Sequence, residues 1–335
     1  MVKLIDLNGI LIRQFEPADA EGIIKLHKLV GWPISNKIFD YWLKYKKYSK
    51  VLVAVIDDIV AGKVTLDIAF PPYSEIVNLV IHPEFRRRGI GSRLVEKCLE
   101  IAEDHKCNIV YLMTEINNEP ALKLYKKFNF LPIIIPKKKQ DYIWLFRFSE
   151  ENFIGEIISE ILFPEFKLSR NRVKFYGGKA YRVQWKNPIK NEMLTLFIKG
   201  QPRQIGGVAP RICGVNYRTK KFSLNIVVHE EDEYVGLERE AKCTVKIVNN
   251  GNAKFKLIKI RPILPNGLIL VSNNLKEIRD IEIKPRDEIN ISLSYRMNES
   301  FDIPPLSFNT ILSSLFIYTD IRDKPLIVSA GFEKK

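Results

Sequence analysis

Apolar and polar residues repeat with two different periods along this chain of 335 residues. In the first part, short apolar runs alternate with stretches whose apolar residues recur at helical spacing. From Val173 onward the dominant period is two, the spacing of half-buried strands. The clearest case alternates Ile289, Ile291 and Leu293 with Asn290, Ser292 and Ser294. The pattern predicts a mixed α+β first domain followed by an all-β domain.

The first part predicts strands and helices that alternate along the chain. The predicted strands are Ile10–Phe15, the hairpin Val51–Ile56 and Ile59–Ala69, Asn78–Ile81, Asn108–Glu115, Phe130–Ile135 and Tyr142–Phe148. The predicted helices are Ala18–Val30, Lys37–Tyr48, one that begins near Arg93, and Pro120–Asn129.

The second part predicts a boundary helix and then many short strands. Ser149 can cap a helix whose apolar stripe runs from Phe153 to Leu162 and which Pro164 ends. We therefore expect a domain at 1–149, a connecting helix or linker at 150–172 and a β-rich domain at 173–335, clearest from about 220. The strands Tyr181–Trp185 and Met193–Ile198 could open a sandwich or form a small connecting unit.

Turn residues separate the later strands, as in a β-sandwich. The turns are at Asn249–Asn252, Pro265–Gly267 and Arg322–Pro325. The segment Thr244–Asn252 resembles the strand and turn of immunoglobulin-like modules. The chain lacks the spaced Cys–Trp–Cys pattern of true immunoglobulin domains, so the resemblance implies an architecture and not membership of that family.

Composition narrows the class of protein. A formal net charge of +14 favours acidic partners, among them nucleic acid, acidic proteins and coenzyme A. The basic clusters Lys44–Lys50 and Lys137–Lys139 match no recognisable RNA or DNA motif, which argues against specific nucleic-acid binding. No apolar run approaches the ~20 residues that span a bilayer, and the four dispersed cysteines suit neither a zinc ribbon nor a redox pair. We expect a cytoplasmic protein without a metal site.

The most specific local feature is the turn after the strand Asn78–Ile81. It contains Arg86, Gly89 and Gly91 and opens an amphipathic helix. The free backbone amides and the dipole at a helix start attract an anion, and residues without Cβ let a phosphate approach closely. The spacing fits neither the dinucleotide fingerprint, because position 94 is Leu94, nor a Walker A loop.

The sequence Arg86-x-x-Gly89-x-Gly91 resembles the coenzyme A pyrophosphate loop of the GCN5-related N-acetyltransferases (GNAT). A second segment, from Asn118 through Ala121, Leu124 and Tyr125 to Phe130, is similar to another motif of that family. The family glycine before the final Phe is Asn129 here, and asparagine tolerates a left-handed helix end. The order of elements agrees as well. The resemblance covers about residues 4–148 and implies an acetyl-coenzyme A-dependent acyltransferase fold.

The resemblance also implies roles for particular positions. The strand Asn78–Ile81 should separate from Asn108–Glu115, so that the backbone of Leu79, Val80 and Ile81 binds pantetheine. Asn118 is expected to bond the pantetheine arm or to cap its helix, and Tyr125 to protonate the leaving thiolate. By spacing alone, Tyr125 would be a core aromatic. The pyrophosphate is expected to bind to Arg86, Arg87, Arg88, Gly89, Ile90, Gly91 and Ser92.

The general base is less well defined by the sequence. Protein N-terminal acetylating relatives often carry Glu five residues before the motif Asn, and that position is Met113 here. Glu115 and Glu75 are equal candidates, and His82 is a third. Each can abstract a proton directly or through water.

Two functions from different classes fit these features. The first is N-acetyl transfer from acetyl-coenzyme A to an amine, with a protein lysine or N-terminal amine favoured over a small molecule, and with the β domain selecting the acceptor or partner. The second is a non-catalytic coenzyme A-binding scaffold whose β half forms the working interface.

Overall fold

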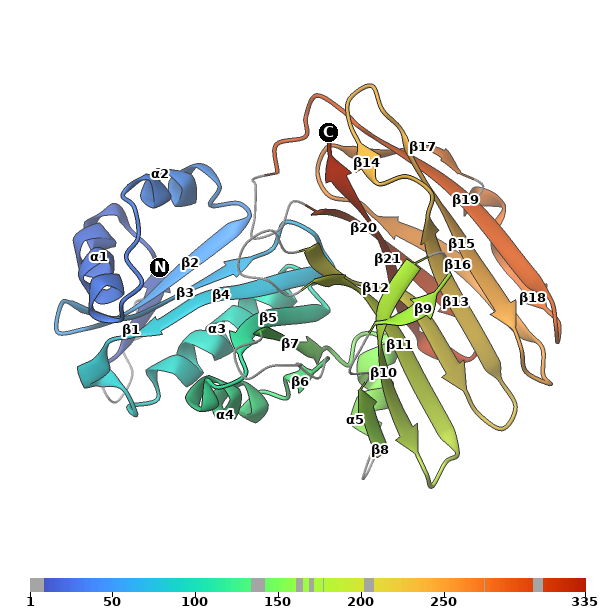
Figure 1. Cartoon of the computed structure of the whole chain (residues 1–335), viewed down its shortest axis with the longest axis horizontal. Helices are drawn as coiled ribbons and strands as arrows, with labels where there is room; N and C mark the ends of the chain where they lie inside the picture. The colour runs from blue at the N-terminus through green and yellow to red at the C-terminus, as the bar shows by residue number, and fades with distance from the viewer. Residues whose placement is uncertain are drawn as a thin grey trace.

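The structure is a computed structural model of the chain. It describes residues 9–133, 142–160, 165–168, 172–176, 178–201, 208–273, 275–303 and 310–335. A mixed α/β half and a strand-rich half lie side by side (Figure 1). The predicted basic cluster Lys137–Lys139 and the end of the predicted boundary helix, Ile161–Pro164, lie outside the described residues.

A seven-stranded sheet of order β1-β2-β3-β4-β5-β7-β6 organises the first half. Neighbouring strands are antiparallel except β4 and β5, which run parallel. The strands are β1 (Leu11–Gln14), β2 (Ser49–Ile56), β3 (Ile59–Asp67), β4 (Tyr73–Ile81), β5 (Ile109–Glu115), β6 (Leu131–Pro132) and β7 (Tyr142–Phe148).

Helices cover both faces of this sheet. Residues of α1 and α2 pack on one face against Val51, Val53 and Val80, while α3 and α4 pack on the opposite face with Val64 and Leu66. The helical segments of this half are η1 (Pro17–Asp19), α1 (Ala20–Leu29), α2 (Lys37–Lys44), η2 (Pro83–Phe85), α3 (Ile90–Asp104) and α4 (Glu119–Lys127). This arrangement agrees with the predicted α/β architecture.

One predicted helix is shorter in the structure. The helix predicted over Lys37–Tyr48 ends at Lys44, because Tyr45 leaves the helical conformation and the chain turns into β2. Of the strand predicted over Phe130–Ile135, the described residues form β6, after which Ile133 donates its N–H to the Trp144 carbonyl, while residues 134 and 135 lie outside the described residues. Asn129 has φ +60°, the left-handed conformation expected for the position where family members carry glycine.

The second half consists of two sheets. One has nine strands in the order β17-β19-β15-β13-β12-β11-β10-β8, with β9 also paired to β10, and the other has the order β14-β21-β20-β16-β18. The strands are β8 (Glu165–Leu168), β9 (Val173–Phe175), β10 (Gly178–Asn187), β11 (Glu192–Gln201), β12 (Val208–Arg218), β13 (Ser223–Glu230), β14 (Tyr234–Val235), β15 (Ala241–Asn249), β16 (Phe255–Ile263), β17 (Leu268–Asn273), β18 (Arg279–Ile283), β19 (Glu288–Met297), β20 (Thr310–Thr319) and β21 (Arg322–Lys334), with a short helix η3 (Leu275–Glu277).

The nine-stranded sheet settles one point that the sequence left open and corrects one prediction. β10 and β11 belong to it, so the segment around residues 178–201 is part of the main β architecture and not a separate unit. The predicted linker 150–172 contains the helix α5 (Phe153–Glu160) as expected, but it also contains β8, which pairs with β10. β21 packs against β12 and β13, so the two sheets face each other. The half is all-β, while its likeness to immunoglobulin modules stays a prediction.

The two halves share one apolar core. The Tyr73 hydroxyl on β4 accepts hydrogen bonds from the Ile212 N–H (3.1 Å) and the Ser329 hydroxyl (3.1 Å) of the second half. The rings of Phe148 on β7 and Trp185 on β10 also meet, with centroids 6.3 Å apart. This continuity fixes the strand-rich half against the end of the seven-stranded sheet.

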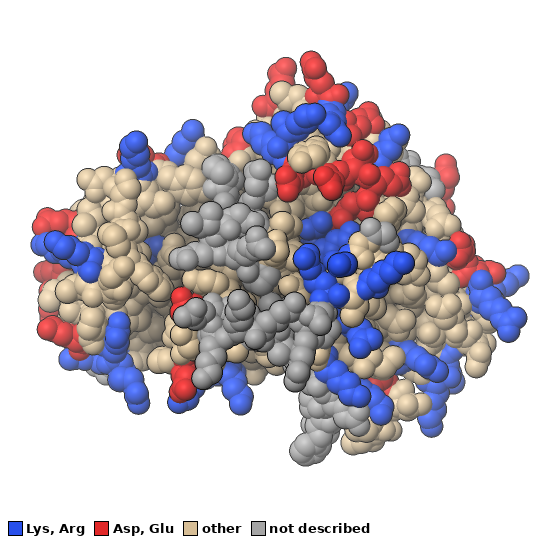
Figure 2. Space-filling model, in the orientation of Figure 1, with Lys and Arg blue, Asp and Glu red and all other residues tan. Residues whose placement is uncertain are grey.

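Charged side chains are distributed over both halves of the face shown in Figure 2, with a gathering of Lys and Arg on the strand-rich half. Within the described ranges, no helix has the length and apolar character needed to cross a bilayer.

Candidate functional site

The central feature of the first half is a fork between its two parallel strands. β4 and β5 are paired only from Tyr73 opposite Ile109 to Ile76 opposite Leu112, and their remaining residues form no ladder with each other. β3 and β4 change register between the pairs Lys63–Val80 and Thr65–Val77, and Asn78 has φ +53°. This bulge bends the end of β4, so the backbone of Leu79–Ile81 forms no ladder with β5.

The fork opens toward the glycine-containing turn. After η2, Arg87 has φ +66° and Gly89 has φ +80°, and Gly89 then caps the start of α3. The N–H groups of Ile90, Gly91 and Ser92 have no carbonyl one turn earlier in α3, and the helix dipole adds positive potential there. The side chains of Arg86, Arg87 and Arg88 are exposed beside these amides. The turn therefore has the geometry of an anion cradle.

The second motif lies on the same face of the sheet as α3. Asn118 caps α4 by accepting a hydrogen bond from the Ala121 N–H (3.3 Å), so its predicted capping role is confirmed. Tyr125 lies on α4 with its ring packed edge-on against Phe130. Burial raises the pKa of the Tyr125 hydroxyl well above its ordinary range, and the nearby Cys98 thiol adds to this. Tyr125 is thus held in its protonated form.

A row of polar side chains crosses the opposite face of the sheet. Ser49, Asp67, Glu75 and Tyr111 are consecutive cross-strand neighbours on β2, β3, β4 and β5, so all four point to one face. The Ser49 hydroxyl donates to Asp67, and the Tyr111 hydroxyl lies 3.4 Å from the Glu75 carboxylate. We call these four residues the polar row. The row lies one residue before the point where the fork opens.

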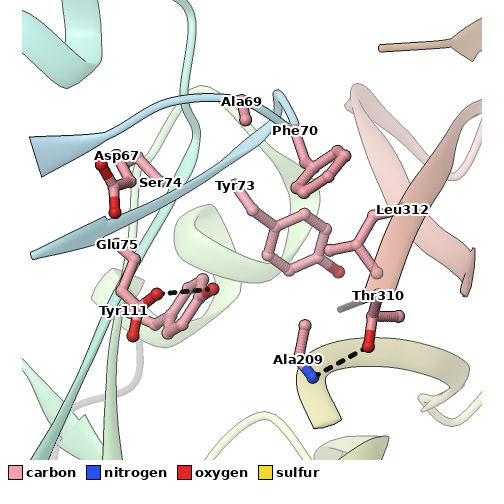
Figure 3. A pocket seen from close by; sticks show the side chains of 10 residues that line it. All are labelled: Asp67, Ala69, Phe70, Tyr73, Ser74, Glu75, Tyr111, Ala209, Thr310 and Leu312. Carbon is pink, nitrogen blue, oxygen red and sulfur yellow. Dashed lines mark hydrogen bonds between the residues drawn. The ribbon is translucent and has the colours of Figure 1, made fainter. Parts of the chain in front are cut away.

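The polar row borders a small cavity between the two halves. Asp67, Glu75 and Tyr111 line it from the sheet, and Ala209, Thr310 and Leu312 line it from the strand-rich half (Figure 3). The remaining lining residues are Ala69, Phe70, Tyr73 and Ser74. About 20 Å³ is open to the centre of a water-sized sphere, which is room for little more than one water molecule. The strand-rich half therefore closes this side of the sheet.

Burial perturbs the ionisation of the polar row. The pKa of Asp67 is raised to about 6, chiefly because its carboxylate is desolvated, while the hydrogen bond from Ser49 and the Lys63 charge oppose the shift. Burial also raises the pKa of Tyr111 well above its ordinary range, and the negative charges of Glu75 and Asp67 add to that shift. A buried carboxylate with a perturbed pKa beside a cleft is typical of functional sites.

The structure separates the three sequence candidates for the base. Glu75 is 5% exposed and lies in the cavity. Glu115 is exposed at the end of β5, where it accepts a hydrogen bond from the Tyr142 hydroxyl (3.2 Å), and it does not line the cavity. His82 caps η2 by accepting the Glu84 N–H. Only Glu75 joins the polar row.

Sequence reasoning missed Asp67, Tyr111 and Ser49. The available signal was a charged residue inside the apolar run Ile59–Ala69, because a charge within a buried strand requires a partner or a function. Lys63 in the same run is fully buried as well. The cross-strand register that assembles the row is set by the Asp57–Asp58 turn and the β4 bulge, and neither can be placed from single residues.

Other reactive groups give no second site in the described part of the chain. No group of three or more His, Cys, Asp or Glu side chains is placed to hold a metal there. Cys98, Cys107, Cys213 and Cys243 are free and buried, and burial raises the pKa of each thiol to about 12. These cysteines are therefore unreactive at neutral pH.

The anion cradle gives a first testable prediction. Replacing Gly89 by Ala forces a side chain into the left-handed conformation without any steric contact within 4 Å, so the turn should relax away from its cradle geometry. We expect the KM for acetyl-coenzyme A to rise about tenfold. Gly31→Ala is the matched control, because Gly31 has φ +76° and equally free surroundings but lies far from the turn in the sequence. An equal rise in KM for both variants would contradict a role of the cradle in binding.

Comparison with known proteins agrees with this geometry. The model of the acetyltransferase (GNAT) family matches residues 19–130. The L-amino acid N-acetyltransferase AaaT of Escherichia coli is 28% identical over 137 residues, which cover 37% of this chain and 84% of AaaT. An N-alpha-acetyltransferase of Saccharolobus solfataricus is 25% identical over 139 residues, which cover 38% of this chain and 83% of that enzyme.

A solved structure is also similar in part. The PaiA N-acetyltransferase of Thermoplasma acidophilum, in complex with coenzyme A, has a TM-score of 0.33 and 17% identity. The match covers 42% of this chain and 99% of that protein.

Proposed function

Because its N-terminal part is an N-acetyltransferase domain of the GNAT type, with acetyl-coenzyme A as donor, we propose that this chain acetylates a protein amine, at a lysine or an N-terminus. The strand-rich half then helps to select the acceptor. The observation that carries this proposal is the fork between β4 and β5, which has an anion cradle at its open end and the buried polar row just behind it.

The donor side of the proposed site is built mainly from backbone. The unpaired groups of Leu79, Val80 and Ile81 would hold the pantetheine arm, and the turn from Arg86 through Ser92 would hold the pyrophosphate. The residues present fit this ligand, because the turn leaves several amides free and the fork leaves one strand edge unpaired. Acetyl-coenzyme A supplies the acetyl group as an activated thioester.

The protein supplies two proton-handling groups from opposite faces of the sheet. Glu75 would take the proton that the amine loses as its nitrogen bonds to the acetyl carbon, directly or through a water molecule. Tyr125 would give a proton to the sulfur as the carbon–sulfur bond breaks. The raised pKa of Tyr125 keeps this proton in place until it is needed. Glu75 gains the proton that the amine loses, and Tyr125 loses the proton that the sulfur gains, so the number of protons on the protein is unchanged.

The strand-rich half supports the proposal of acceptor selection. Ala209, Thr310 and Leu312 face the polar row across the cavity (Figure 3). Any acceptor that reaches Glu75 from this side must therefore pass or displace residues of the second half. A protein acceptor suits an appended domain of this size, and the S. solfataricus relative is named as an N-alpha-acetyltransferase.

The experiment that tests the function measures release of the coenzyme A thiol by the purified chain. Acetyl-coenzyme A is supplied with short peptides that carry free N-termini and lysines. We expect thiol release that depends on the peptides, and about tenfold slower turnover for Tyr125→Phe with unchanged acetyl-coenzyme A binding. Tyr142→Phe is the control, since Tyr142 bonds the exposed Glu115. Binding of acetyl-coenzyme A without peptide-dependent thiol release would contradict catalysis and favour the scaffold.

A further inference from the structure

The cavity behind the fork holds two carboxylates and no described cation. Asp67 and Glu75 are directly opposite each other on β3 and β4 and are 8% and 5% exposed. Side chains of such a pair lie about 5 Å apart at their Cβ atoms. None of the ten described residues that line the cavity is Lys, Arg or His. An acceptor that passes or displaces the residues of the second half to reach Glu75 therefore also lies close to the Asp67 carboxylate.

The opposite wall offers little to a negatively charged group. Ala209 and Leu312 are apolar, and the Thr310 hydroxyl, which accepts the Ala209 N–H (3.3 Å), is the single uncharged donor that these three side chains provide. Arg211, on β12 near this wall, bonds Glu230 through its Nε (2.7 Å), and its buried Nη1 has no hydrogen-bond partner among the described residues, but Arg211 does not line the cavity. Like charges within a few ångströms and away from water repel strongly. A carboxylate attached next to the acceptor amine would meet this repulsion, which the Lys63 charge on the same strand reduces but does not cancel, because the pKa of Asp67 stays raised.

We propose that Asp67 determines acceptor specificity by admitting amines that have no neighbouring negative charge, such as a peptide N-terminus or a lysine side chain, and rejecting free α-amino acids. In a free amino acid, one carbon separates the amine from a carboxylate. In a peptide, the same position carries an uncharged amide. This inference rests on the proposed function and names the chemical class of its acceptor.

The test compares two acceptors that differ only at this position, L-alanine and L-alaninamide. Rates are expressed per concentration of unprotonated amine, because the two amino groups have different pKa values in solution. We expect a kcat/KM at least tenfold higher for the amide. In Asp67→Asn this ratio should fall severalfold, because the asparagine keeps the shape and removes the charge. Asp67→Glu should retain the preference, and Asp58→Asn, in the exposed β2–β3 turn, is the matched control.

The pH dependence gives a second measurement on the unaltered chain. The pKa of Asp67 is raised to about 6, so the preference should weaken as the pH falls through that value and Asp67 becomes neutral. The charged or titratable groups that face Asp67 are Lys63 on its own strand, Glu75 on β4, Tyr41 on α2 and Tyr111 on β5. The two tyrosines have raised pKa values and stay neutral in this range.

The outcomes separate this inference from the proposed function. Equal rates for alanine and alaninamide, or a ratio that Asp67→Asn leaves unchanged, would overturn the role of Asp67 while acetyl transfer stands. If a preparation that acetylates peptides acetylates neither alanine nor alaninamide, the role of Asp67 is overturned as well. Absence of transfer to every amine, peptides included, would instead refute the proposed function.

Discussion

Replacing Glu75 by Gln is expected to lower kcat about 100-fold, the size of effect typical for loss of a general base. Glu75 lies at the closed end of the fork, buried beside Tyr111, on the face opposite the anion cradle. The glutamine keeps the size of the side chain and cannot accept the proton of the amine. The measurement is kcat with a saturating peptide acceptor, together with the dissociation constant for acetyl-coenzyme A, which should not change.

Glu115→Gln is the matched control for this prediction. Glu115 is equally a glutamate on a neighbouring strand, but it is exposed and bonded to Tyr142. We expect its kcat to stay within about twofold of the unaltered chain, as for a surface substitution away from the chemistry. If Glu115→Gln caused the larger loss, the base would have to act from the strand end and the assignment of Glu75 would be wrong.

Replacing Lys63 by Met is expected to stabilise the protein by about 3 kcal/mol at pH 6. Lys63 is fully buried on β3, and its ammonium nitrogen lies 4.4 Å from the ring centroid of Trp42. Among the described residues this nitrogen has no hydrogen-bond partner. Methionine fills a similar volume without a charge, so the substitution removes the cost of desolvation and keeps the packing.

The lowered pKa of Lys63 determines how the stability of the protein changes with pH. Burial lowers the pKa of Lys63 from 10.5 to about 7, so between these values the unfolded chain binds more protons than the folded one. Stability therefore rises with pH across this window, and the penalty is complete below about pH 7. The advantage of Lys63→Met should accordingly shrink between pH 7 and pH 10.

Urea unfolding at pH 6 and pH 9 checks this prediction. Lys25→Met is the control, because the Lys25 side chain is exposed on α1 and pairs with the exposed Glu21. It should change the free energy of unfolding by less than about 0.5 kcal/mol at either pH. A Lys63→Met variant that is less stable than the unaltered chain at pH 6 would show that the cation is stabilised by its surroundings.

Local sequence signals predicted much of the fold. Apolar patterning located β2, β3, α3, α4 and β10 to within a few residues, because β2 and β3 are buried on both faces as continuous apolar runs, whereas α3, α4 and β10 each bury one stripe or face. The end of α2 was missed, since it depends on where the chain must turn toward its next partner. β8 was assigned to a linker because four residues of a sheet edge carry too little pattern to identify a strand.

The candidate site was predictable on its donor side only. The turn around Gly89 and Gly91 is contiguous in the sequence, so its geometry follows from local residue types. The acceptor side combines Ser49, Asp67, Glu75 and Tyr111 through strand register, and completes its wall with residues 209 to 312. Non-local contacts of this kind leave no periodic signal in the sequence.

The ribosome makes one wall of the cavity much later than the other. All seven strands of the first sheet are complete at Phe148, whereas Thr310 and Leu312 belong to β20, the second-last of the described strands in the sequence. N-terminal domains generally fold first during synthesis. The acetyltransferase half would then fold with Tyr73, Trp144 and Phe148 still uncovered, and its acceptor side would be open to any nascent chain nearby. On the proposed function, selectivity for the acceptor would then be acquired late in translation, when β20 joins its sheet.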